Sequence, residues 1–444
     1  MAEKTKGLAG LLAGNIIFRS LNIACTLLIT FLLTRAMGAE GFGMLSLMIA
    51  NAALLNLLTC FGAESGITYH YSSGSLTKPA LTSIAHVIIL LQLLALLIVQ
   101  GVYHFYTGKF LLAESEAGME PMLYGLLYFV SVVTIDKYQA FFNAAHQYNR
   151  PVRIVFGVNL LSVIVYAFCY FGVSGVAADT FALIFILASA LQALLMAISF
   201  HVFTKQPLRF TFVRRFEWTM FFSYSFVVLI TNIIQFLAYR IDYWLIDYYK
   251  GTQQLGYYSL SVRLGQLLWF LPLLMAGILF PRIAGNADAE EEAKWLSLVR
   301  ISNAAFLVIA IIAMPASFWI IPFFAGEKFE ESVIPFICLL PGLLFFCFNI
   351  IFAAWFAGRG MLKINLYGSV LCLVLVLTLD LLLIPGFGIK GAAIASSIAY
   401  TAAGIHHLCW FAFYKKQSVW SLVIANQNDW RIIKHYLGKY TGRE

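Results

Sequence analysis

The sequence predicts an all-α protein that crosses a membrane about twelve times. Three observations lead to this prediction. Hydrophobic residues make up 61% of the 444 residues and charged residues only 11%, which is more apolar surface than a soluble core can bury. The apolar segments are about 20 residues long, the length of a membrane-crossing helix and not of a barrel strand. A segment near the N-terminus also returns in the second half of the chain, which predicts two similar lobes.

The repeat consists of residues 31–47, FLLTRAMGAEGFGMLSL, and residues 244–260, WLIDYYKGTQQLGYYSL. Identical residues occupy matching positions of the two copies: Leu32, Gly38, Gly43, Ser46 and Leu47, and then Leu245, Gly251, Gly256, Ser259 and Leu260. Each copy lies between two apolar runs and is predicted to form a tight hairpin. We expect Gly38 and Gly251 to take a left-handed conformation that ends a helix. Gly43 and Gly256 would let the next helix begin close by.

Taken in order, the apolar segments divide into a six-helix N-terminal lobe, residues 1–202, and a six-helix C-terminal lobe, residues 217–413. The predicted N-terminal spans are 11–34, 42–61, 81–106, 122–144, 154–173 and 180–201. The predicted C-terminal spans are 218–246, 255–280, 296–324, 333–356, 364–384 and 391–413. A basic cytoplasmic connector, residues 203–216, joins the lobes. Residues 414–444 mix aromatic and basic residues, which predicts an amphipathic cytoplasmic tail at the membrane surface or against a partner.

The Lys and Arg residues of the predicted loops indicate the orientation. With a cytoplasmic N-terminus, most of them fall on the inner side, and the outer side keeps Arg35, Lys109, Lys250, Lys328 and Lys390. This positive-inside pattern predicts that both termini are cytoplasmic. Because six spans separate the two copies of the repeat, the lobes are expected to share one orientation and a pseudo-two-fold axis along the membrane normal. The net charge of +8 therefore reflects topology, and nucleic acid is not an expected partner.

The sequence contains none of the motifs expected of an enzyme in this setting. It has no phosphate-binding GxxxxGK[ST] loop, no HExxH motif and no large soluble loop with paired carboxylates. The seven cysteines lie in apolar segments without CxxC spacing, so neither a disulfide framework nor a metal site is expected.

Basic residues inside the predicted spans are candidate substrate-binding residues. A charge at the bilayer centre costs at least about 2.5 kcal/mol on insertion scales and usually faces a cavity or a partner. Arg19 lies roughly 12 Å into the first span. Arg240 and Arg263 flank the hairpin at Gly251, so they are expected at similar depth and predict a shared anion such as pyrophosphate. The alternative is that Arg240 pairs with a carboxylate or reaches toward the membrane surface.

Two acids of the C-terminal lobe, Asp242 and Asp380, are candidate ion-coupling residues. They lie at similar predicted depths, and a Na⁺ or H⁺ held between them would couple an ion gradient to transport. Ser396, Ser397 and Thr401 of the last span are candidate oxygen ligands. The alternative is that either acid neutralises an arginine of the cavity.

Charged residues of the N-terminal lobe are interpreted as structural. Asp136 and Lys137, in the fourth predicted span, are expected to form a buried polar pair with another helix. Glu64 and His70, near the inner end of the second span, are expected at the membrane interface, with a proton-linked role as the alternative.

The two hairpins also carry a family resemblance. TRAMGAEGFGMLSL after the first span, and RIDYWLIDYYKGTQQLGYYSLSVRLGQLL with Pro281, Arg282 and Ile283 beyond it, resemble the polysaccharide transporter branch of the multidrug/oligosaccharidyl-lipid/polysaccharide (MOP) exporter superfamily. Within that branch the chain is most similar to Wzx-type flippases. The resemblance implies two six-helix lobes around a central cavity, as in MATE transporters. It also implies alternation between inward-open and outward-open states without ATP hydrolysis.

Together these features predict a flippase, not an enzyme, in a bacterial inner membrane. It would move an undecaprenyl-pyrophosphate-linked oligosaccharide repeat unit by alternating access, for O-antigen, capsule or exopolysaccharide synthesis. No cofactor is expected apart from a coupling Na⁺ or H⁺. The expected partners are the lipid-linked oligosaccharide, the bilayer, and a polysaccharide polymerase with its chain-length machinery.

Two alternatives stay open. A cation-coupled multidrug antiporter of the same superfamily would need an acid in the cavity of the first lobe, where the first span offers Arg19. A lipid II flippase usually has two further helices.

Overall fold

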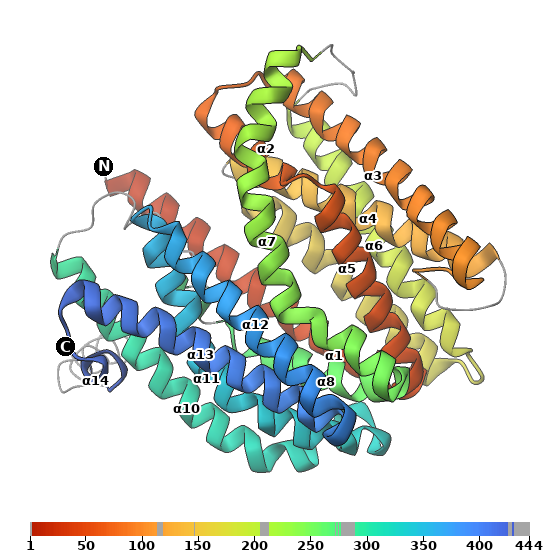
Figure 1. Ribbon diagram of the computed structural model, residues 1–444. Coiled ribbons are helices and arrows are strands. Elements are labelled where there is room, and N and C mark those ends of the chain that lie inside the picture. The colour runs from red at the N-terminus through yellow and green to blue at the C-terminus, as the bar shows by residue number, and fades with distance from the viewer. Residues whose placement is uncertain are drawn as a thin grey trace. The chain divides into compact units, whose positions relative to one another are not determined.

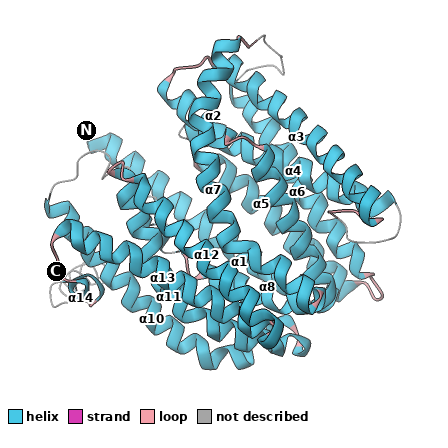
Figure 2. Ribbon diagram, in the orientation of Figure 1, coloured by secondary structure: helices cyan, strands magenta, loops and turns pink. Residues whose placement is uncertain are grey.

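A computed structural model describes residues 2–112, 119–145, 147–204, 213–270, 272–273, 275–276, 289–424 and 429. These residues form helices joined by short loops, and none of them forms a strand (Figure 2). Seven helical segments among them are long and apolar enough to cross a membrane. The predicted all-α, multi-pass membrane fold is confirmed.

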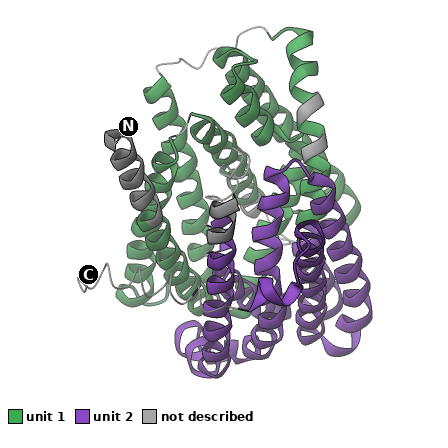
Figure 3. Cartoon of the chain, turned by 90° about the vertical axis from the view of Figure 1, so that its left-hand side faces the viewer, with its two compact units in different colours: residues 1–236 green, residues 237–444 purple. Residues whose placement is uncertain are grey.

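The chain divides into two compact units, Met1–Phe236 and Leu237–Glu444 (Figure 3). The first unit contains α1 (Ala2–Thr59), α2 (Ala63–Ser73), α3 (Lys78–Thr107), α4 (Met119–Ala144), α5 (Asn149–Ala167) with a π-helical turn over Phe168–Gly172, α6 (Ala178–Thr204) and the first part of α7 (Arg215–Lys250). The second contains the rest of α7, α8 (Thr252–Leu267), α10 (Ala289–Ala325), a 3₁₀ turn over Glu327–Ser332, α11 (Val333–Gly358), α12 (Leu362–Phe387), α13 (Ile389–Lys415) and α14 (Val419–Val423) (Figure 1).

The division lies within α7, whereas the sequence suggested a boundary at the connector. The cause is close packing of α2 against the first part of α7. A Cβ atom on Gly62 would lie 2.2 Å from the backbone oxygen of Ser225, and one on Gly66 would lie 2.3 Å from the Ser225 hydroxyl. Small residues let membrane helices approach this closely. The first part of α7 therefore packs as part of the first unit. Residues 205–212 of the expected connector lie outside the described residues.

Each predicted span overlaps a helix. The first two fall largely on α1. Length and hydropathy mark seven segments as candidate membrane spans: Ile17–Thr59, Lys78–Thr107, Asn149–Gly172, Ala178–Thr204, Leu296–Ala325, Glu327–Gly358 and Leu362–Phe387. The other four predicted spans fall on α4, α7, α8 and α13. α4 and α7 contain buried charged residues, Lys137 and Asp242. The end of the span predicted over 255–280 and the residues 281–283 lie outside the described part of the chain.

The two copies of the repeat have the same backbone geometry at their first glycine. Gly38 has φ 68° and ψ −175° and lies at a kink within α1. Gly251, between α7 and α8, has φ 84° and ψ 167°. Both φ values lie in the region that favours glycine, as the repeat predicted, although ψ is extended and not helical. Gly43 and Gly256 are buried within the helices that follow.

α11 and α13 approach each other closely through two glycines of the second unit. A Cβ atom on Gly404 would lie 2.1 Å from the backbone oxygen of Phe345, and one on Gly342 would lie 2.4 Å from the Cα atom of Ser397. The Gly342 amide donates a hydrogen bond to the Ser397 hydroxyl at 2.9 Å. This crossing fixes the position of α13.

We expect Gly404→Ala to destabilise the protein by about 1–3 kcal/mol, because the added methyl group must displace the α11 backbone. Unfolding in mixed detergent micelles measures the change. Gly386→Ala is the matched control, since a Cβ atom on Gly386 would meet nothing within 4 Å. Equal stability of the two variants would contradict the close crossing.

The C-terminal tail is tied to α10 by a buried ion pair. Arg300 donates from Nε and Nη2 to the Asp429 carboxylate at 2.7 and 2.8 Å, and from Nη1 to the Ser421 carbonyl at 3.2 Å. Leu422 of α14 is buried in a hydrophobic cluster with Trp355 and Phe411. The start of the expected tail is thus packed on the second unit. Residues 425–428 and 430–444 lie outside the described residues.

Candidate functional site

A buried carboxylate in the second unit is held by hydroxyl groups. Asp242 of α7 is 2% exposed. Its Oδ2 accepts a hydrogen bond from the Tyr258 hydroxyl at 2.5 Å and one from Ser396 Oγ at 3.4 Å. The Tyr258 hydroxyl and Ser396 Oγ are 3.2 Å apart. Residues of α7, α8 and α13 therefore meet at Asp242.

A second carboxylate faces the same cluster. Asp380 of α12 is 0% exposed and acts electrostatically on Asp242 and Tyr258. Within the described part of the chain, Asp242 Oδ1 and both Asp380 oxygens have no hydrogen-bond donor. Two buried carboxylates that act on each other electrostatically repel when both are ionised. A cation or proton between them would relieve that repulsion.

Of the three oxygen ligands expected from α13, the structure brings Ser396 to the acids. The Ser397 hydroxyl accepts the Gly342 amide hydrogen bond. The Thr401 hydroxyl donates to the Ser397 carbonyl at 2.8 Å. The sequence did not single out Tyr258 as a partner of Asp242, because the two residues lie on different helices.

Arg240 of α7 is half-buried, and its recorded hydrogen bonds go to neutral groups. Nη1 donates to the Tyr243 hydroxyl at 2.7 Å and Nη2 to Gln266 Oε1 at 3.4 Å. The guanidinium carbon lies 4.8 Å from the centre of the Tyr243 ring. Arg240 also attracts the Asp242 carboxylate electrostatically.

Arg263 of α8 is half-buried in the same unit. The charges of both Arg240 and Arg263 act on Tyr243, so both arginines lie within electrostatic range of one side chain. Arg19 belongs to α1 in the first unit, where it is exposed. The structure therefore brings together Arg240, Arg263 and the two acids, while Arg19 is part of another unit.

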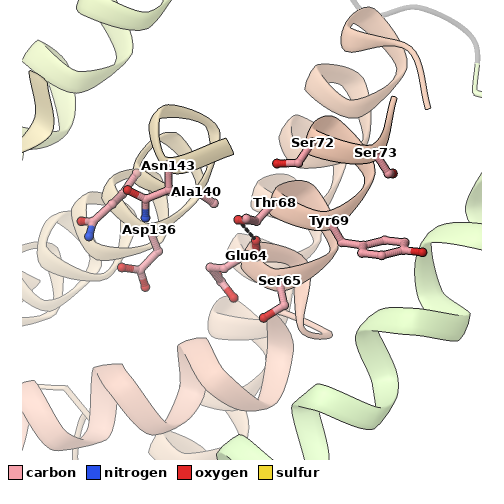
Figure 4. A pocket seen from close by; sticks show the side chains of 10 residues that line it. Glu64, Ser65, Thr68, Tyr69, Ser72, Ser73, Asp136, Ala140 and Asn143 are labelled. Carbon is pink, nitrogen blue, oxygen red and sulfur yellow. Dashed lines mark hydrogen bonds between the residues drawn. The ribbon is translucent and has the colours of Figure 1, made fainter. Parts of the chain in front are cut away.

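The first unit contains a cavity of about 720 Å³ between α2 and α4 (Figure 4). The residues that line it are mostly hydroxyl-, amide- and carboxylate-bearing: Glu64, Ser65, Thr68, Tyr69, Ser72, Ser73, Asp136, Gln139, Ala140 and Asn143. Figure 4 shows Glu64 and Asp136 reaching from the two helices toward the space between them. This cavity was not among the candidate sites of the sequence.

Buried partners hold the two carboxylates of the cavity. Glu64 forms an ion pair with Lys137, which is 1% exposed. Asp136 Oδ2 accepts a hydrogen bond from Asn56 Nδ2 at 2.6 Å, and Asn56 Oδ1 accepts one from Gln92 Nε2 at 2.8 Å. Lys137 thus makes a buried polar pair with another helix, as expected. Glu64 is its partner and not simply an interfacial residue.

No group of three or more His, Cys, Asp or Glu side chains among the described residues is arranged to hold a metal ion. Asp242 and Asp380 of the second unit are two acids and do not make such a group.

Comparison with solved structures shows the same fold in membrane transporters. The lipid II flippase MurJ, in an inward closed conformation, has 14% identity and a TM-score of 0.74, over 92% of this chain and 88% of that one. A multidrug resistance MATE family transporter of the MOP superfamily, inward-facing, has 13% identity and a TM-score of 0.65, over 92% and 98% of the chains. A MOP superfamily transporter from Pyrococcus furiosus has 15% identity and a TM-score of 0.63, over 93% and 95%. At these identities the likeness concerns the fold.

Comparison with curated proteins found no match. The model of one family, described as polysaccharide biosynthesis protein, matches residues 12–287, which is more than half of the chain. The protein therefore belongs to the polysaccharide biosynthesis protein family, and its fold is that of the MOP-superfamily transporters.

Proposed function

We propose that this protein is a cation-coupled flippase for an undecaprenyl-pyrophosphate-linked oligosaccharide repeat unit. The observation that supports the proposal is the pairing of an anion-binding group with a cation-binding group in one unit. The charges of Arg240 and Arg263 both act on Tyr243, and the buried carboxylates Asp242 and Asp380 act on each other in the same unit. In a transporter of this family, the arginines would bind the anionic part of a lipid-linked substrate and the acids would bind a coupling cation.

The arginines suit the pyrophosphate of a lipid carrier. Guanidinium groups bind phosphate oxygens through two parallel hydrogen bonds. The recorded hydrogen-bond partners of Arg240, the Tyr243 hydroxyl and Gln266, are neutral. A phosphate oxygen can replace either partner without leaving a buried carboxylate unpaired.

The acid pair suits the coupling ion, Na⁺ or H⁺. Asp242 and Arg240 lie two residues apart on α7 and attract each other. A cation bound between Asp242 and Asp380 would change that attraction and with it the affinity of Arg240 for an anion. By linkage, the anionic substrate would change the affinity of the acid pair for the cation by the same factor, which couples the two transport events.

The proposal places the protein in a bacterial inner membrane with both termini in the cytoplasm. The substrate would enter from the cytoplasmic leaflet and leave in the outer leaflet by alternating access. A polysaccharide polymerase and its chain-length machinery would then use the flipped units.

Transport in proteoliposomes tests the proposal. A fluorescent polyprenyl-pyrophosphate oligosaccharide is placed in both leaflets, and an impermeant glycosidase measures the outward fraction with and without an inward Na⁺ or H⁺ gradient. We expect outward movement that depends on one of these gradients and exceeds that of protein-free vesicles. Movement of lipid II or of a cationic dye, with none of the oligosaccharide lipid, would instead favour one of the two alternative functions.

A further inference from the structure

The cavity between α2 and α4 differs chemically from the arginine and acid cluster of the second unit. Its volume of about 720 Å³ lies within the range of small-molecule sites, about 300–1,000 Å³. Such sites are usually lined by apolar side chains with a few polar groups. Among the described residues that line this cavity, Ala140 is aliphatic and the others carry hydroxyl, amide or carboxylate groups beside the apolar carbons of their side chains.

The charges of the cavity argue against an anion. The Glu64 carboxylate is held by Lys137, which is buried behind the lining and does not itself line the cavity. Asp136 accepts its recorded hydrogen bond from a neutral amide, that of Asn56. The lining therefore keeps a net negative character, so phosphate and acidic sugars would be repelled.

The hydrogen-bonding groups of the cavity suit sugar hydroxyls. A sugar ring presents many O–H groups that both donate and accept, and carboxylates and amides are strong partners for them. Thr68 donates its hydroxyl to the Glu64 carbonyl at 2.8 Å, which leaves its oxygen as an acceptor (Figure 4). Gln139 and Asn143 add amide donors and acceptors, and Tyr69 adds an aromatic face.

We propose that this cavity binds the saccharide part of the lipid-linked substrate and selects neutral or amino sugars over acidic ones. This inference rests on the proposed function. The Glu64–Lys137 ion pair fixes the Glu64 carboxylate, and the Asn56–Gln92 hydrogen bonds fix Asp136. In the proposed orientation the ends of α2 and α4 face the cytoplasm, where the substrate is collected.

Binding of soluble sugars to the protein in nanodiscs tests the inference directly. Three probes are used: the disaccharide formed by two N-acetylglucosamine units, the monosaccharide glucosamine, and the monosaccharide glucuronic acid. Ligand-observed NMR measures their binding. We expect the first two to bind, and glucuronic acid to bind at least about tenfold more weakly because of its charge. Equal binding of all three probes would overturn the inference.

Two variants and one control variant locate the binding. Asn143→Trp fills the cavity and should weaken disaccharide binding at least about tenfold, whereas Gln417→Trp, at an exposed position of the other unit, should leave it unchanged. Asp136→Asn keeps an acceptor for Asn56 and should raise the relative affinity for glucuronic acid. The assignment of the cavity would be overturned if a folded Asn143→Trp variant bound the disaccharide as the wild type does. It would also be overturned if Asp136→Asn kept the wild-type preference against glucuronic acid.

The outcome is separable from that of the proposed function. Sugar binding at the cavity without any flipping of the oligosaccharide lipid would refute the flippase and keep the saccharide site. If the wild type and Asn143→Trp flip the oligosaccharide lipid at the same rate, the flippase function is kept and the saccharide site is refuted.

Discussion

Replacing Asp380 by asparagine is expected to abolish the dependence of transport on the cation gradient and to slow gradient-driven flipping at least about tenfold. Asp380 is 0% exposed, and neither of its oxygens has a hydrogen-bond donor among the described residues. Asparagine has nearly the same shape but no charge, so the repulsion between Asp380 and Asp242 disappears. The need for a bound cation disappears with it. Initial flipping rates at several Na⁺ concentrations and pH values measure the effect.

Asp247→Asn is the matched control for Asp380→Asn. Asp247 lies on α7 in the same unit, is half-exposed, and accepts a hydrogen bond from Thr252 at 2.8 Å, which asparagine can also accept. We expect its ion dependence to equal that of the wild type. Stability should separate the two variants as well, because Asp380→Asn removes a buried charge and is expected to raise the unfolding temperature. An Asp380→Asn variant with wild-type ion dependence would exclude Asp380 from coupling.

Local sequence patterns were sufficient to predict the helices and the hairpins. A run of apolar residues determines where a membrane helix forms, because its backbone must satisfy its own hydrogen bonds. Gly38 and Gly251 were found from the repeat, since a positive φ at a helix end favours glycine wherever it occurs. Arg240 and Arg263 were paired by counting residues from one hairpin, on the expectation that neighbouring antiparallel helices share depth.

Contacts between helices distant in sequence were harder to predict. Depth along a helix can be counted, but rotation about its axis changes by about 100° per residue. This is why Ser396 faces Asp242 while its neighbour Ser397 faces the Gly342 amide. The Glu64–Lys137 pair joins α2 to α4, and nothing local to either helix indicates the partner.

The boundary between the compact units lies away from the predicted connector for a similar reason. The composition of residues 203–216 is that of a linker, so it suggested where one lobe ends. The packing of Ser225 against Gly62 and Gly66 depends on which faces of α2 and α7 meet. That choice follows from shape complementarity between distant segments, which composition does not encode.

Replacing Arg263 by alanine is expected to lower the export of surface polysaccharide about ten- to a hundredfold, because a hydrogen bond to a charged group contributes about 1.5–3 kcal/mol. Arg240→Ala should have an effect of the same order, since both arginines act on Tyr243. Glycan display at the cell surface and binding of inorganic pyrophosphate to the purified protein are the two measurements. Arg215→Ala is the matched control, because Arg215 is an exposed arginine at the start of α7.

Conservative replacements separate charge from geometry at these positions. Lysine keeps the positive charge but lacks the paired donors of a guanidinium group. If the arginines bind the pyrophosphate through paired hydrogen bonds, Arg263→Lys should recover little of the export that Arg263→Ala loses. If a single positive charge is sufficient, Arg263→Lys should recover much of that export. Wild-type glycan display and pyrophosphate binding in both Arg240→Ala and Arg263→Ala would remove the arginines from the mechanism. The acid pair alone would then favour the alternative function, a cation-coupled antiporter for uncharged or cationic compounds.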